Sequence, residues 1–67
     1  MTSLAHMIRV FQSGGLSHNE FLAQVDRVLA ADHANSARLL KILGEEHHKM
    51  PLIRPTLRRL RRLCVRH

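Results

Sequence analysis

The sequence predicts an all-α fold, a small bundle of four short helices arranged as two helical hairpins. Apolar residues recur at three- and four-residue intervals in four stretches, which is the periodicity of one face of an α-helix. Glycine, proline and capping residues separate these stretches, and no useful length of chain alternates apolar and polar residues as a half-buried strand does. We therefore expect helices over residues 3–12, 18–31, 35–47 and 55–65.

The first expected helix has a clear start, apolar face and end. The spacing i, i+3, i+4, i+7 links Leu4, Met7, Ile8 and Phe11. Thr2 or Ser3 can serve as the N-cap. The run Ser13-Gly14-Gly15 ends the helix, because glycine adopts the left-handed C-cap conformation at little cost.

The second helix begins with the clearest local signal in the chain. Ser17 and Glu20 match the capping box S-x-x-E, in which Ser17 accepts from the Glu20 amide and Glu20 reaches back to the Ser17 amide. Leu16 and Phe21 occupy the two positions of a hydrophobic staple. An apolar arc of about 120° then follows, and it contains Phe21, Leu22, Val25, Val28 and Leu29.

The third and fourth helices have less distinct boundaries. Asp32 and Asn35 can each cap the third helix. Gly44 fits either a C-terminal cap or an interior position that costs about 1 kcal/mol. Pro51 and Pro55 indicate a turn, and Pro55 suits the first position of the last helix.

We expect residues 1–67 to form a single small helical domain with a basic C-terminal helix at about 55–65. A chain this short buries only about 60% of its unfolded surface, so a partner or a second copy would add stability. The expected core consists of Leu4, Ile8, Phe11, Leu16, Phe21, Leu22, Val25, Leu29, Leu39, Leu40, Leu43, Leu57 and Leu60.

The most informative feature is the concentration of arginine in the last 14 residues. At about 100° per residue, one arc of this helix is apolar and the opposite arc is basic. The apolar arc contains Leu57, Leu60, Leu63 and Cys64. The candidate partner-binding residues on the basic arc are Arg54, Arg58, Arg59, Arg61, Arg62 and Arg66. They account for the formal net charge of +6, since the rest of the chain carries five basic and five acidic residues.

Several classes of function receive little support from the sequence. A single cysteine, Cys64, excludes an internal disulfide, and apolar stretches fall short of the roughly 20 residues of a membrane span. The six histidines lack the H-E-x-x-H pattern. We therefore expect no catalytic residue, no cofactor and no metal site. No secretory signal is visible, so a cytoplasmic location is expected.

Residues 15–21, Gly-Leu-Ser-His-Asn-Glu-Phe, followed by Leu29, carry a family resemblance. Residues 4–30 resemble the helical hairpin of the short C-terminal domain (SHOCT) family, and also similar helical interaction segments of bacterial signalling proteins. The segment is N-terminal here, unlike its position in the SHOCT family. The resemblance implies an interaction or oligomerisation module and transfers no catalytic residue.

The sequence favours a non-enzymatic protein-interaction module, with a docking or regulatory role, that binds an acidic protein surface through the arginine-rich last helix. The alternative is a small basic DNA- or RNA-binding protein that contacts phosphates through the same arginines. No aromatic residue interleaves the basic run to stack on bases. A membrane surface is disfavoured because the apolar side lacks Trp and Phe, while homo-oligomerisation remains open.

Overall fold

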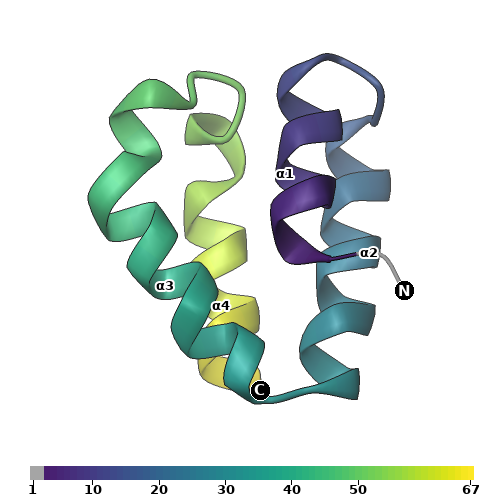
Figure 1. Cartoon of the computed structure of the whole chain (residues 1–67), viewed down its shortest axis with the longest axis vertical. Coiled ribbons are helices and arrows are strands. Elements are labelled where there is room, and N and C mark those ends of the chain that lie inside the picture. Colours follow the sequence, from purple (N-terminus) through teal and green to yellow (C-terminus); the bar gives the residue numbers. More distant parts are fainter. Residues whose placement is uncertain (1–2) are drawn as a thin grey trace.

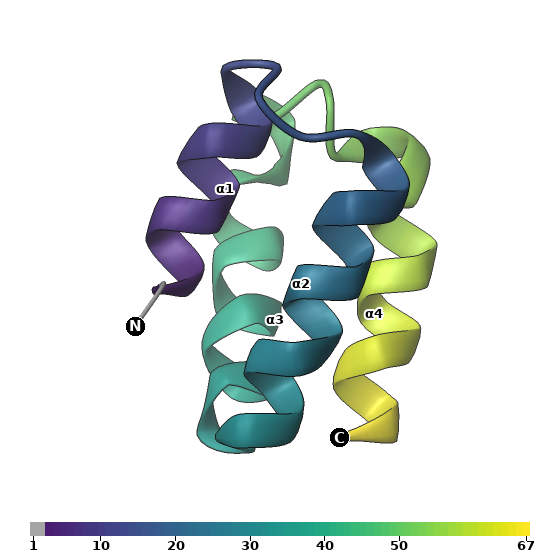
Figure 2. The ribbon, with the colours of Figure 1, turned by 90° about the vertical axis from the view of Figure 1, so that its right-hand side faces the viewer.

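A computed structural model describes residues 3–67 and confirms the all-α prediction, with no strand among these residues. The elements, in order, are α1 (Leu4–Gln12), α2 (His18–Ala31), α3 (Ala34–Glu46), the 3-10 turns η1 (His47–Lys49) and η2 (Arg54–Thr56), and α4 (Leu57–Arg66). The helices form two hairpins that lie side by side, α1 with α2 and α3 with α4 (Figure 1). Helix α2 contacts both helices of the second hairpin (Figure 2).

The first hairpin forms as its local signals predict. The Ser3 hydroxyl accepts a hydrogen bond of 3.2 Å from the His6 amide, while Thr2, the other candidate cap, lies outside the described residues. Gly14 follows α1 with a φ of 83°, the left-handed conformation that a side chain disfavours. These two features set both ends of α1.

The capping box at the start of α2 is only half as predicted. The Ser17 hydroxyl accepts from the Glu20 amide at 3.2 Å, as expected. The prediction that Glu20 accepts from the Ser17 amide was wrong, because the Glu20 carboxylate instead accepts from the Ser17 hydroxyl at 3.0 Å. A hydroxyl can accept one hydrogen bond and donate another, so the Ser17 oxygen makes both contacts.

The connection to α3 and the end of that helix resolve two open alternatives. His33 occupies the N-cap position of α3 and makes no side-chain cap bond. Asp32, one residue earlier, supplies the capping contact, because its carboxylate accepts from the Ala34 amide at 3.0 Å, whereas Asn35 lies inside the helix. Gly44 is also an interior residue, because α3 continues to Glu46.

The start of the last helix differs from the prediction. Pro55 lies in turn η2, and α4 begins two residues later at Leu57. The Thr56 amide bonds to the Ile53 oxygen at 2.9 Å, an i→i+3 bond that tightens this segment into a 3-10 turn. The Thr56 hydroxyl, which is buried, donates to the same oxygen at 3.0 Å.

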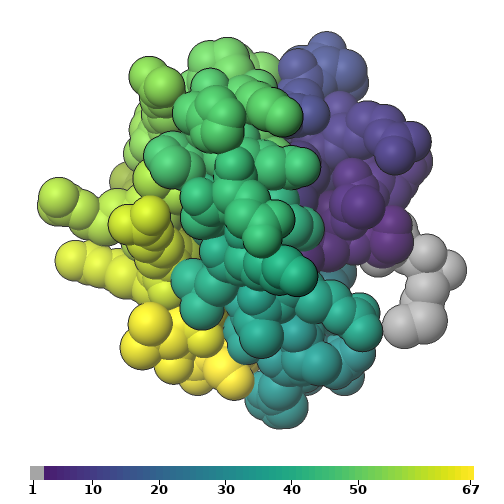
Figure 3. Space-filling view, turned by 60° about the vertical axis from the view of Figure 1, so that its left-hand side comes forward, coloured from purple at the N-terminus to yellow at the C-terminus, as the bar shows by residue number. Residues whose placement is uncertain are grey.

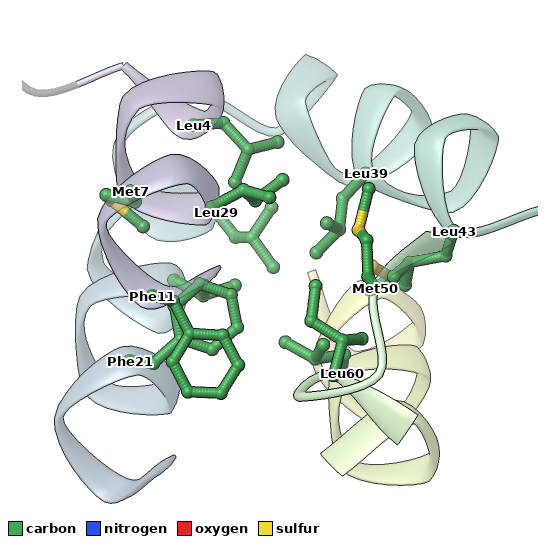
Figure 4. Close-up of a cluster of buried hydrophobic side chains, with 13 residues drawn as sticks. Leu4, Met7, Phe11, Phe21, Leu29, Leu39, Leu43, Met50 and Leu60 are labelled. Carbon is green, nitrogen blue, oxygen red and sulfur yellow. The ribbon is translucent and has the colours of Figure 1, made fainter. Parts of the chain in front are cut away.

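A single apolar core joins the two hairpins (Figure 4). The rings of Phe11 and Phe21 stack with centroids 4.2 Å apart. The predicted core residue Leu40 is wrong, since it is 42% exposed. The expected members that pack only partly buried against the core are Leu16, Leu22 and Leu57. The buried residues absent from the expected core are Met7, Met50, Ile53 and Cys64.

Candidate interaction surface on helix α4

Helix α4 has one side in the core and the opposite side exposed. Leu60 and Cys64 are buried, and Leu57 and Leu63 pack partly buried beside them. The arginines predicted to bind a partner are all exposed: Arg54, Arg58, Arg59, Arg61, Arg62 and Arg66. In Figure 3, side chains in the colours of η2 and α4 project from the surface beside α3.

Contacts at the carboxyl end of α4 hold the helix in this orientation. His67 Nε2 lies 2.6 Å from Asp26 Oδ1 of α2, and the His67 side chain is only 16% exposed. His33 Nδ1, in the connection between α2 and α3, lies 3.1 Å from the His67 backbone oxygen. Rotation of α4 about its axis would break these contacts and withdraw Leu60 from the core, so the arginines stay on the outer side.

The charges of these arginines are not neutralised within the described part of the chain. Among residues 3–67, the one contact within 4.0 Å between a basic side-chain nitrogen and a carboxylate oxygen joins His67 to Asp26. No arginine of α4 or η2 therefore has a carboxylate within that distance. Arg58 with Arg62, and Arg62 with Arg66, are instead like-charged pairs four residues apart on α4, which destabilise a helix by about 0.2–0.5 kcal/mol each.

The exposed side of α4 contains a hollow of about 560 Å³, here called the α4 hollow. Its lining residues are Arg54, Leu57, Arg58, Arg61, Arg62 and Val65. Arg59 and Arg66 lie outside that lining. The structure thus groups four of the six predicted arginines around one concave surface and places the other two beside it.

Val65 is the residue of this surface that the sequence prediction missed. Its side chain is 85% exposed although it is apolar. A signal was present, because the helical spacing of about 100° per residue puts Val65 between Arg61 and Arg58 on the arginine arc. Because that arc was defined by charge alone, Val65 was left out of the predicted surface.

A larger hollow of about 780 Å³ lies elsewhere, between α1, α2 and α3. Leu4, Met7 and Val28 are among its apolar lining residues. Its charged lining residues are two cations, Arg27 and Arg38, and Asp32. This mixed charge gives the larger hollow a weaker preference for anions than the four cations of the α4 hollow.

Three further features bear on metal binding, cysteine reactivity and membrane insertion. Residues 3–67 contain no group of three or more His, Cys, Asp or Glu side chains placed to hold a metal ion. Burial raises the pKa of the Cys64 thiol, which disfavours the reactive thiolate. Within the same residues, no helix is both long enough and apolar enough to cross a membrane.

Comparison with known proteins found no matching family model, no matching curated protein and no matching solved structure. The resemblance of residues 4–30 to the SHOCT family therefore stays a prediction. Residues 4–12 and 18–31 do form a helical hairpin joined through glycine, an arrangement that many helical proteins share.

Proposed function

We propose that this chain is a cytoplasmic, non-enzymatic protein-interaction module, with a docking or regulatory role, that binds an acidic protein surface through α4. The observation that carries the proposal is the set of six exposed arginines with no carboxylate within 4.0 Å among the described residues. Arginine pairs with carboxylates in a bidentate geometry, so a partner rich in Asp and Glu would complete hydrogen bonds that the isolated chain leaves to water.

The energetics of the isolated helix support a binding role. Arg58, Arg62 and Arg66 repel one another along the exposed side of α4, and a surface arranged only for stability would mix charges of both signs. A carboxylate partner relieves this repulsion as it binds. The concentrated positive field would also accelerate association with an acidic surface, an effect that salt screens.

The competing function is binding of DNA or RNA through phosphate contacts. The arginine side chains suit phosphate as well as carboxylate. However, single-stranded RNA recognition relies on exposed aromatic rings that stack on bases, and both phenylalanines, Phe11 and Phe21, are buried in the core. The exposed apolar Val65 also gives no advantage against a row of phosphates. We therefore favour the protein partner.

Salt dependence of binding to random duplex DNA separates the two functions. If the four arginines of the α4 hollow contacted phosphates, the logarithm of the binding constant would fall with the logarithm of salt concentration with a slope of about −3.6. Fluorescence anisotropy with labelled duplex would measure that slope. Our proposal predicts negligible DNA binding at physiological salt, together with direct binding to an acidic protein. Micromolar DNA affinity with the steep slope would overturn it.

A further inference from the structure

The α4 hollow lies between two rows of side chains, each spaced by four residues. On α4 one row contains Arg58 and Arg62, and the other contains Leu57, Arg61 and Val65, while Arg54 of turn η2 also lines the hollow. Rows of this spacing are the ridges of a helix surface, and the groove between two of them accepts a ridge of a second helix in the commonest mode of helix packing. The spacing of these rows therefore suits a ridge of another helix.

The chemistry of the hollow is apolar as well as basic. One exposed valine is ordinary on a protein surface, but Val65 shares its hollow with the half-buried Leu57. A β-branched valine is a poorer helix former than arginine or glutamine, and at 85% exposure Val65 contributes little to the core. Folding alone gives no reason for this residue, whereas an apolar contact with a partner would use it.

We propose, building on the function proposed above, that the partner's binding element is an acidic amphipathic helix that packs along α4. An aliphatic side chain of that helix enters the α4 hollow and contacts Leu57 and Val65. Its flanking carboxylates pair with the surrounding arginines. Carboxylates four residues apart on the partner helix are about 6 Å apart along its axis, which matches the rise between Arg58 and Arg62.

The residues of the proposed contact are of the kinds found in stable protein interfaces. Their central contacts are apolar and arginine-rich, and a polar rim excludes water. The arginines of the hollow would place charged pairs around the apolar contact of Val65. A duplex would leave Val65 against charged phosphate oxygens, so the apolar centre favours the helix over nucleic acid.

The test uses two synthetic peptides of about 15 residues, long enough for measurable helicity. Both contain the same leucines, glutamates and alanines. In the amphipathic peptide the leucines recur at i, i+3, i+4 and i+7 with glutamates flanking them, and in the scrambled peptide the leucines share no face. We expect the wild-type chain to bind the amphipathic peptide at least about tenfold more tightly than the scrambled one, because only the first can bury its leucines in the hollow.

Matched variants locate the contact. Arg58→Gln with Arg62→Gln, inside the hollow, is expected to weaken binding of the amphipathic peptide by more than about tenfold. Arg9→Gln with Arg27→Gln removes the same charge from exposed positions on α1 and α2 and should weaken binding by less than about threefold. Val65→Ser is expected to weaken binding of the amphipathic peptide by about tenfold and to leave binding of the scrambled peptide unchanged. Circular dichroism confirms that each variant is folded.

The outcomes separate this inference from the function on which it rests. If Arg58→Gln with Arg62→Gln abolishes binding but Val65→Ser and peptide scrambling change nothing, the acidic-partner function survives and the helical partner is overturned. If Arg58→Gln with Arg62→Gln keeps wild-type affinity, both proposals are overturned. Displacement of the amphipathic peptide by random duplex DNA at physiological salt would also overturn both, because it would show that phosphates are the better ligand.

Discussion

Replacing Phe21 by Ala should remove most of the stability of this fold. Phe21 is fully buried, and its ring stacks on Phe11 with an interplanar angle of 5°. Phe→Ala substitutions in cores cost about 3–5 kcal/mol, and the lost stacking, worth about 0.5–1.5 kcal/mol, places this one toward the upper end. A 67-residue domain has a total stability of about 3–10 kcal/mol.

Urea denaturation followed by far-ultraviolet circular dichroism measures the loss. For a domain this small the slope is about 1 kcal/mol per molar urea, so Phe21→Ala should leave little or no folded baseline. Phe21→Leu keeps most of the apolar volume and should lower the midpoint by about 1 M, since near-isosteric core changes cost up to about 1.5 kcal/mol. Val65→Ala, at an 85% exposed position, serves as the control. A Phe21→Ala midpoint within about 0.5 M of wild type would refute the packing described above.

Four further predictions concern local structure and burial. Ser17→Ala should cost about 1 kcal/mol, the usual loss for an N-cap, and an unchanged thermal melt would contradict the cap. Gly44→Ala should stabilise the fold by up to about 1 kcal/mol, because an added methyl group meets nothing within 4 Å. Gly14→Ala, at a φ of 83°, should destabilise the fold by about 1–2 kcal/mol. A urea midpoint that shifts in the opposite direction would contradict the prediction for that variant. Cys64, buried and with its pKa raised by that burial, should react with iodoacetamide far more slowly in the native chain than in urea, since only the thiolate reacts; equal rates measured by mass spectrometry would refute its burial.

The parts of the fold that depend on local chemistry were predictable. Ser17 as a cap and Gly14 as a C-terminal glycine act within a few residues, so the bounds of α1 and α2 follow closely from the sequence. Segments stabilised by distant contacts were less predictable. Met50 and Ile53 lie in a connection without helical periodicity, yet both are buried. Both belong to the core cluster that joins the two hairpins, and this tertiary packing has no counterpart in the local sequence pattern.

The candidate surface on α4 was also predictable where it depends on local periodicity, and not where it depends on tertiary shape. Periodicity placed six arginines on one side of the last helix, and all six are exposed. The sequence did not separate those that line the α4 hollow from Arg59 and Arg66, because that separation depends on the shape of the surface around the helix. It also did not anticipate that Leu40, which is three residues before Leu43, faces outward. The apolar positions of this helix cover a broad arc, and the sequence alone does not show which part of that arc another helix covers.

The central claim is that the arginines of α4 serve binding rather than folding. The most direct measurement compares the wild-type chain with the variant in which Arg58, Arg59, Arg61 and Arg62 are replaced by Gln, and records urea stability and affinity for the amphipathic acidic peptide on the same samples. Glutamine keeps helix propensity and removes the like-charge repulsion. We expect equal or slightly higher stability together with loss of peptide binding. A variant that keeps full affinity, or one that unfolds because the arginines were needed for the fold, would contradict it.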